Sequence, residues 1–171
     1  MRLPEGTEQV FLRPGEMYFG TGNVQVCTVL GSCVALTVWH PESRFGGLCH
    51  AMLPQRMRRT TEALDGRFAD EAFEMVMAAV DRRGRPRREY QCKLFGGGRM
   101  FADPQAGGNH YDVPGNNIDG CRALAVRHGL IVSVEDLGGR RSRYLVFDLT
   151  NGDVWVRKRG VAVSSTLRGA A

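Results

Sequence analysis

The chain has 171 residues and a formal net charge of +5 at neutral pH, with 43% apolar and 24% charged residues. This balance is typical of one globular domain, which we expect to fill residues 1–171, with a core at about 10–158 and frayed ends at 1–9 and 160–171. No run approaches the roughly 20 consecutive apolar residues of a membrane helix, and no apolar signal segment opens the chain. We therefore expect a cytoplasmic protein without membrane insertion.

Much of the positive charge lies in three groups of arginines, within residues 56–59, 82–88 and 140–143. Basic groups can bind nucleic acid, but no aromatic-interleaved motif or known nucleic-acid-binding pattern accompanies these. We therefore expect an acidic protein partner and no nucleic acid. Arg56, Arg58 and Arg59 follow His50 most closely, and we expect their charge to steer such a partner toward the protein.

Five cysteines are spread over the chain without a CxxC pair. An odd number of scattered cysteines is typical of free thiols in a reducing compartment. Zinc ligands usually come in pairs about two to four residues apart, which neither the adjacent Cys49-His50 nor the Cys27–Cys33 spacing matches. We expect neither a metal ion nor an organic cofactor.

The first half of the chain is rich in predicted strands. Residues 1–15 indicate an irregular or edge segment. Three β-rich runs bounded by turn residues follow, at residues 24–29, 34–39 and 48–53. A helix is predicted over residues 67–83, because apolar residues recur there at helical spacing and Gly84 follows.

In the second half, a short strand predicted at residues 92–95 runs into three glycines, residues 96–98. No P-loop Lys-Ser/Thr pair follows, so we interpret these glycines as backbone that another element approaches closely. A loop over residues 102–116 leads to a second helix at about 118–128. Three strands close the chain, at residues 130–135, 144–147 and 154–157. The pattern predicts an α/β fold of the α+β type: a mixed, mostly antiparallel sheet sandwich with two main helices.

Cys33 is the most promising nucleophile, because it stands where the turn Leu30-Gly31-Ser32 enters a strand. Such a junction can expose a sulfur and aim backbone N–H groups at a developing oxyanion. His50 lies on the next predicted strand, and a hairpin with Leu36 opposite His50 is one register that brings the imidazole near the thiol. The imidazole could then take the proton of a thiol that is mostly uncharged at neutral pH.

A third group must orient the imidazole, and the hydroxyl of Thr28 could accept its N–H. Cys49 is adjacent to His50, but alternation along a strand points it to the opposite side. The remaining histidines are weaker candidates: we interpret His40 and His128 as structural and keep His110 in reserve. Most cysteines in β-rich runs are core residues, so at this point Cys33 is a candidate and no more.

Several motifs in order resemble the CheD family: TVLGSCVA at 28–35, GGLCH at 46–50, MLP at 52–54, KLFGG at 93–97 with MF at 100–101, EDLGG at 135–139 and FD at 147–148. The resemblance covers about residues 10–158. It implies a fold similar to that of cytotoxic necrotizing factor toxins. It also implies an enzyme, a protein-glutamine glutaminase that converts selected chemoreceptor glutamines to glutamate and releases ammonia through a cysteine thioester.

The resemblance assigns catalytic roles to a Cys, a His and a Thr, of which the first two match Cys33 and His50. It implies the cytoplasmic domains of chemoreceptors as protein substrates and a CheC-type phosphatase as a further partner. The family threonine lies five or six residues before the cysteine, where this chain has Thr28 and Cys27. Only one of two adjacent strand residues can face the site, and we choose Thr28 because a thiol is a poor hydrogen-bond acceptor.

The chain departs from the family pattern at Pro114 and Asn116, which stand where the family usually has Gly and Arg. We expect this departure to alter the loop geometry. Two other functions stay open. One is a non-catalytic binding module for a chemotaxis phosphatase or receptor, and the other is a thiol enzyme that passes its substrate to amines in place of water. An intact Cys33–His50 pair favours the deamidase.

Overall fold

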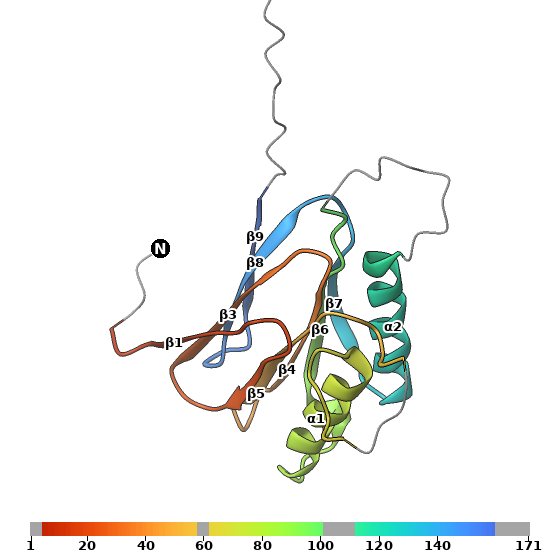
Figure 1. The fold of residues 1–171 in the computed structure, drawn as a ribbon. Coiled ribbons are helices and arrows are strands. Elements are labelled where there is room, and N and C mark those ends of the chain that lie inside the picture. Colours follow the sequence, from red (N-terminus) through yellow and green to blue (C-terminus); the bar gives the residue numbers. More distant parts are fainter. Residues whose placement is uncertain (1–4, 58–61, 101–111, 160–171) are drawn as a thin grey trace, which may run out of the picture.

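The computed structural model describes residues 5–57, 62–100 and 112–159, which form two sheets and two main helices (Figure 1). The strands are β1 (Glu8–Phe11), β2 (Met17–Gly20), β3 (Val24–Leu30), β4 (Val34–His40), β5 (Phe45–Ala51), β6 (Gln91–Gly96), β7 (Val132–Leu137), β8 (Ser142–Asp148) and β9 (Val154–Arg159). The helices are α1 (Ala69–Asp81), α2 (Val113–Arg127) and the short 3₁₀ helix η1 (Arg87–Glu89). Of the ends predicted to be frayed, residues 1–4 and 160–171 lie outside the described residues.

The two sheets are mixed and mostly antiparallel. One has the strand order β1-β3-β8-β9 and the other the order β2-β5-β4-β6-β7. Within the described residues, β1 pairs in parallel with β3 and β6 with β7, and the other strand pairs are antiparallel. Together with the two main helices, this arrangement confirms the predicted fold class.

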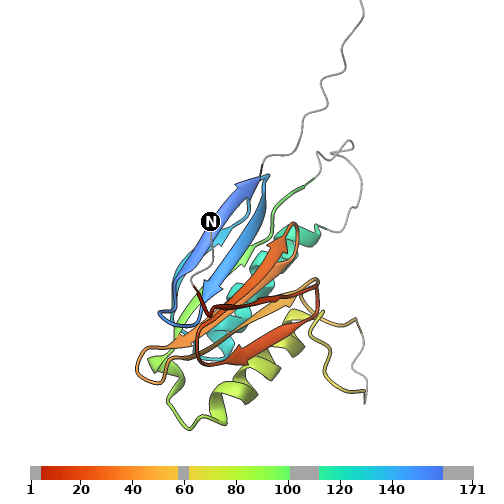
Figure 2. The same ribbon diagram turned by 90° about the vertical axis from the view of Figure 1, so that its left-hand side faces the viewer.

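Two helices cover one face of the five-stranded sheet, and the four-stranded sheet packs on its other face (Figures 1 and 2). Alternation along the central strand β4 accounts for the layers. Val34, Leu36 and Val38 lie in the core beneath the helices, whereas Ala35 and Trp39 belong to the core between the sheets. β4 is buried along its whole length, which explains its largely apolar sequence.

The N-terminal region differs from the prediction. β1 is an edge strand, which agrees with the irregular or edge segment predicted over residues 1–15, but β2 was not predicted. Gly47, which precedes the strand predicted at residues 48–53, lies within β5, where a Cβ atom would collide with the ring of Phe19 on β2. The glycine therefore lets β2 pack along β5. β5 covers Phe45–Ala51 in place of the predicted residues 48–53, because it pairs with β4 from Phe45 to Ala51.

Helix α2 also begins earlier than predicted, at Val113 instead of about Ile118. The carboxylate of Asp112 accepts the N–H of Gly115 at 3.1 Å and so caps the helix. Pro114 lies in the first turn, where its missing N–H has no hydrogen bond to lose. The Pro- and Gly-containing run that indicated a loop is in fact the start of the helix.

Candidate active site

The glycine segment that follows β6 packs against the turn that carries Cys33. The Cys33 carbonyl accepts the N–H of Gly97, and the Gly31 carbonyl accepts the N–H of Gly98, each at 2.8 Å. Gly96 has a φ of 111°, and a Cβ atom there would collide with the Cys33 carbonyl. The interpretation of these glycines as closely approached backbone is confirmed. Their effect is to fix the turn from its carbonyl side.

The pairing of β4 with β5 brings His50 to the face that bears Cys33. His50 lies opposite Ala35, so the register with Leu36 opposite His50 is wrong by one residue. The slip matters because side chains alternate between the two faces of a strand. With Leu36 opposite, His50 would point toward the helices. With Ala35 opposite, it points into the space between the sheets, where Cys33 also packs.

His50 is almost fully buried, with 1% of its surface exposed, and Thr28 on β3 anchors its ring. Thr28 Oγ1 lies 2.8 Å from His50 Nδ1 and 2.9 Å from the carbonyl oxygen of Leu12. The single hydroxyl hydrogen goes to that carbonyl, so Oγ1 accepts the hydrogen on Nδ1. The other ring nitrogen, Nε2, then carries the lone pair. It has no hydrogen-bond partner among the described residues.

Burial also sets the charge of the imidazole. It lowers the pKa of His50 to about 4 because the charged ring is poorly solvated there, and the negative charge of Glu16 offsets only part of this effect. The His50 backbone is fixed as well: its N–H donates to the Glu16 carbonyl at 3.1 Å, and its carbonyl accepts from Gly15 at 2.7 Å. At neutral pH His50 is therefore an uncharged base held in one tautomer.

The structure brings Thr28, and not Cys27, to the imidazole. The two residues face opposite sides of β3, as strand alternation requires. Cys27 points away from the site, and its sulfur accepts a hydrogen bond from Gln9 Nε2 at 3.2 Å. Thr28 is fully buried between the sheets. Of the two adjacent residues, Thr28 is thus the one whose side chain contacts the imidazole, and its catalytic role stays a prediction.

Cys33 is the one partly exposed thiol of the five cysteines, all of which lie in the described residues. Burial raises the pKa of Cys49 to about 11 and the pKa values of Cys92 and Cys121 to about 12. Partial burial also raises the pKa of Cys33, although its own backbone amide lowers it somewhat. At neutral pH the site therefore pairs a neutral thiol with a neutral imidazole. The thiol proton of Cys33 must therefore move to His50 during the reaction and not before it.

The other histidines make different contacts. His40 Nε2 lies 3.0 Å from the Glu89 carboxylate, and His40 Nδ1 accepts the N–H of Ser43 at 3.1 Å, so both nitrogens are used in the fold. Burial lowers the pKa of His128, and the charge of Arg87 adds to the effect. The reserve candidate, residue 110, lies outside the described residues. Within the described ranges, no group of three His, Cys, Asp or Glu side chains is placed to hold a metal ion.

Arg56 forms ion pairs within the fold. Its guanidinium pairs with Glu71 at 2.7 Å and with Glu62 at 2.9 Å, and its side chain is only 17% exposed. The carboxylates of Glu71 and Glu62 therefore balance much of its charge, and the steering of a partner by this group stays a prediction. Residues 58 and 59 lie outside the described residues.

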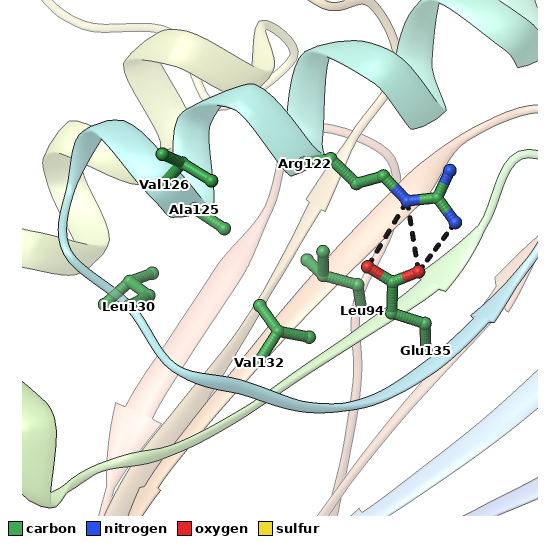
Figure 3. Close-up of a pocket in the computed structure, with 7 residues that line it drawn as sticks. All are labelled: Leu94, Arg122, Ala125, Val126, Leu130, Val132 and Glu135. Atoms are coloured by element: carbon green, nitrogen blue, oxygen red, sulfur yellow. Dashed lines mark hydrogen bonds and ion pairs between the residues drawn. The ribbon is translucent and has the colours of Figure 1, made fainter.

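A surface hollow of about 340 Å³ lies elsewhere, between the C-terminal half of α2 and β7 (Figure 3). Its walls are mostly apolar, and an ion pair between Arg122 and Glu135 at 2.7 Å closes one side. It contains neither Cys33 nor His50. The hollow is therefore distinct from the cysteine–histidine site.

Comparison with known proteins gives a consistent result. The family model for CheD, described as chemotactic sensory transduction, matches residues 52–158. A probable chemoreceptor glutamine deamidase CheD of Pseudomonas fluorescens is 46% identical over 157 residues, which are 92% of this chain and 88% of that protein. One from Pseudomonas syringae pv. tomato is 43% identical over 165 residues, 96% of this chain and 97% of that protein.

A third relative, a probable chemoreceptor glutamine deamidase CheD 3 of Dechloromonas aromatica, is 44% identical over 153 residues, 90% of this chain and 89% of that protein. These similarities place the chain among the proteins of chemotactic signal transduction. More narrowly, it belongs to the CheD family. In the part of the chain that the structure describes, no helix is long and apolar enough to cross a membrane.

Proposed function

We propose that this chain is a cytoplasmic protein-glutamine glutaminase that deamidates chemoreceptor glutamines, with Cys33 as nucleophile, His50 as base and Thr28 as the group that orients the base. The observation that carries the proposal is the His50 ring: Thr28 anchors Nδ1, so the lone pair on Nε2 lies on the face that bears Cys33. The relatives, named as probable chemoreceptor glutamine deamidases, supply the class of substrate.

In the first step, Cys33 Sγ attacks the side-chain amide carbon of a substrate glutamine while His50 Nε2 takes the thiol proton. A neutral base with a low pKa is a weak acceptor, but it is fully unprotonated at neutral pH and therefore always ready. The resulting imidazolium is stabilised at Nδ1–H by Thr28 Oγ1. His50 then gives the proton to the amide nitrogen, the C–N bond breaks, and ammonia leaves a thioester on Cys33.

The backbone amide of Cys33 is the candidate oxyanion donor. It lies beside its own sulfur, where its N–H already lowers the thiol pKa. An oxygen bonded to the carbon under attack would lie next to the same N–H. One such donor is worth about 3–4 kcal/mol of transition-state stabilisation in comparable hydrolases.

In the hydrolysis of the thioester, water is the nucleophile and the Cys33 sulfur is the leaving group. His50 Nε2 removes a proton from water, the hydroxide adds to the thioester carbon, and the C–S bond breaks. The proton returns from His50 to the sulfur, which leaves a glutamate side chain and the starting thiol. Every proton transfer in the cycle uses the same nitrogen, so the fixed tautomer of His50 serves both halves.

Ammonia release tests this proposal. The parent protein and a matched Cys33→Ala variant are each mixed with the purified cytoplasmic fragment of a chemoreceptor. We expect ammonia from the parent mixture and none above background from the variant. Equal release from both proteins would contradict the role of Cys33. Incorporation of an added amine into the receptor in place of water would instead indicate a transglutaminase.

A further inference from the structure

The side chain of Asn117 joins the two segments that carry Cys33 and His50. It projects from the first half of α2 and is fully buried. Its Nδ2 donates to the carbonyl of Ser32 at 2.9 Å and to the carbonyl of Met52 at 2.8 Å. An amide nitrogen has two hydrogens, so both are used. Ser32 directly precedes Cys33, and Met52 follows His50 by two positions.

These two carbonyls need an outside donor because the ladder between β4 and β5 ends just before them. Its last pair is Val34 with Ala51. Beyond this pair the chain after β5 turns away, and the N–H of Met52 donates to the carbonyl of Arg67 at 2.8 Å. The amide of Asn117 spans the opening between the diverging ends. It replaces the ladder hydrogen bonds that the strands no longer provide.

The support behind Asn117 is itself fixed. Asp112 caps the start of α2, and Arg99 forms an ion pair with Asp112 at 2.5 Å. Arg99 follows the glycine segment that holds the carbonyl of Cys33, and its own N–H donates to the carbonyl of Gly139 at 2.8 Å. The first turn of α2 and the glycine segment therefore form one frame. That frame holds three consecutive carbonyls, at residues 31–33.

The contacts of Asn117 come from its amide nitrogen and not from its amide oxygen. Its Oδ1 is buried and has no hydrogen-bond partner among the described residues. An unpaired buried polar atom costs about 1–3 kcal/mol, which an apolar side chain would avoid. The amide nitrogen, by contrast, makes two hydrogen bonds that no apolar side chain can make.

We propose that Asn117 is a positioning residue, which sets the separation between Cys33 Sγ and His50 Nε2 by tying the nucleophile turn to the end of β5. The inference rests on the proposed function of that pair. Asn117 acts through Cys33 and His50 and does not itself contact the substrate amide. Because reacting groups must be held closely, a displacement of about 1 Å can reduce turnover roughly 10²-fold.

The test measures how fast Cys33 reacts with iodoacetamide at neutral pH, since this reaction needs no receptor. Asn117→Ala is made in the parent and in a His50→Asn background. We expect it to slow Cys33 alkylation about tenfold in the parent and less than about twofold without the imidazole, as for two residues that act through one interaction. An equal effect in both backgrounds would overturn the proposal, because Asn117 would then act on Cys33 without His50.

Leu124→Ala is the matched control for stability, because Leu124 is buried on the same helix and belongs to the core between the helices and the five-stranded sheet. It should lower the thermal midpoint at least as much as Asn117→Ala and leave Cys33 alkylation near the parent rate. Alkylation that falls with stability in both variants would contradict the positioning role. If Asn117→Ala does not fold, Asn117→Ser, which keeps one donor, takes its place. Failure of both to fold would assign Asn117 to the fold alone.

Deamidation adds a second readout. On a receptor fragment, Asn117→Ala should lower kcat about 10²-fold and leave KM near the parent value. A raised KM with an unchanged kcat would contradict the positioning role. If the parent itself deamidates no receptor, the proposed function fails, but the alkylation comparison still decides the role of Asn117.

Discussion

The buried, uncharged imidazole of His50 should make the stability of the protein depend on pH in a predictable way. The pKa of His50 is about 4 in the fold and 6.5 for a free histidine, mainly because burial disfavours the charged ring. Between these values the unfolded chain binds a proton that the folded chain does not. The contribution of the neutral His50 to the free energy of unfolding is therefore complete above pH 6.5 and is lost as the pH drops toward 4.

The size of this effect follows from the same two values. Across the full interval, His50 alone should remove about 3 kcal/mol from the free energy of unfolding. His50→Asn provides the comparison, because its side-chain amide can still donate to Thr28 Oγ1 but does not ionise. The smaller side chain of Asn lowers the free energy of unfolding by the same amount at every pH. Any difference in pH dependence between the two proteins therefore comes from the ionisation of His50.

Urea unfolding of both proteins between about pH 7.5 and pH 4.5 measures the difference. The parent should lose about 2–3 kcal/mol more than His50→Asn over this range. Parallel curves would refute the reasoning, since they would mean that His50 is protonated as readily in the fold as in the unfolded chain. The account of a neutral, anchored base would then be wrong.

The remaining predictions concern single side chains. Near neutral pH, iodoacetamide should modify Cys33 faster than the other four thiols, as mapped by peptide mass, and a faster reaction at a buried cysteine would contradict the assignment. Thr28→Val should lose most activity and Cys27→Ser should keep most of it; the reverse would move the third role to position 27. Arg56→Ser should lower the thermal midpoint, whereas Arg85→Ser, which breaks a more exposed pair, should change it little; equal midpoints would mean that the less exposed pair stabilises the fold no more than the more exposed one.

Much of the fold could be predicted from local patterns. Helix α1 was predicted within two residues at each end, because its apolar spacing is regular and Gly84 follows it. The strands predicted at residues 144–147 and 154–157 are β8 and β9, which pair as a hairpin through Asn151-Gly152, a dipeptide typical of such turns. β2 could not be predicted, because it is short and depends on Gly47, whose role appears only when Phe19 packs over it.

The candidate site was predictable in its residue types but not in its geometry. Cys33 and His50 stand in recognisable motifs, and hydrogen-bonding chemistry favoured Thr28 over Cys27. The strand register was wrong by one residue, because β4 is buried on both faces and its sequence does not mark which face is which. Asn117 received no role in positioning, because its contacts depend on how α2 packs against the two strand ends.

The most direct test of the central claim is to locate the modified residues in the substrate. A purified chemoreceptor cytoplasmic fragment is incubated with the parent protein or with Cys33→Ala, digested, and mapped by mass spectrometry for glutamine converted to glutamate. We predict conversion at a small set of glutamines with the parent protein and none with Cys33→Ala. An unmodified receptor after incubation with the folded parent protein, or the same conversion with Cys33→Ala, would contradict the account.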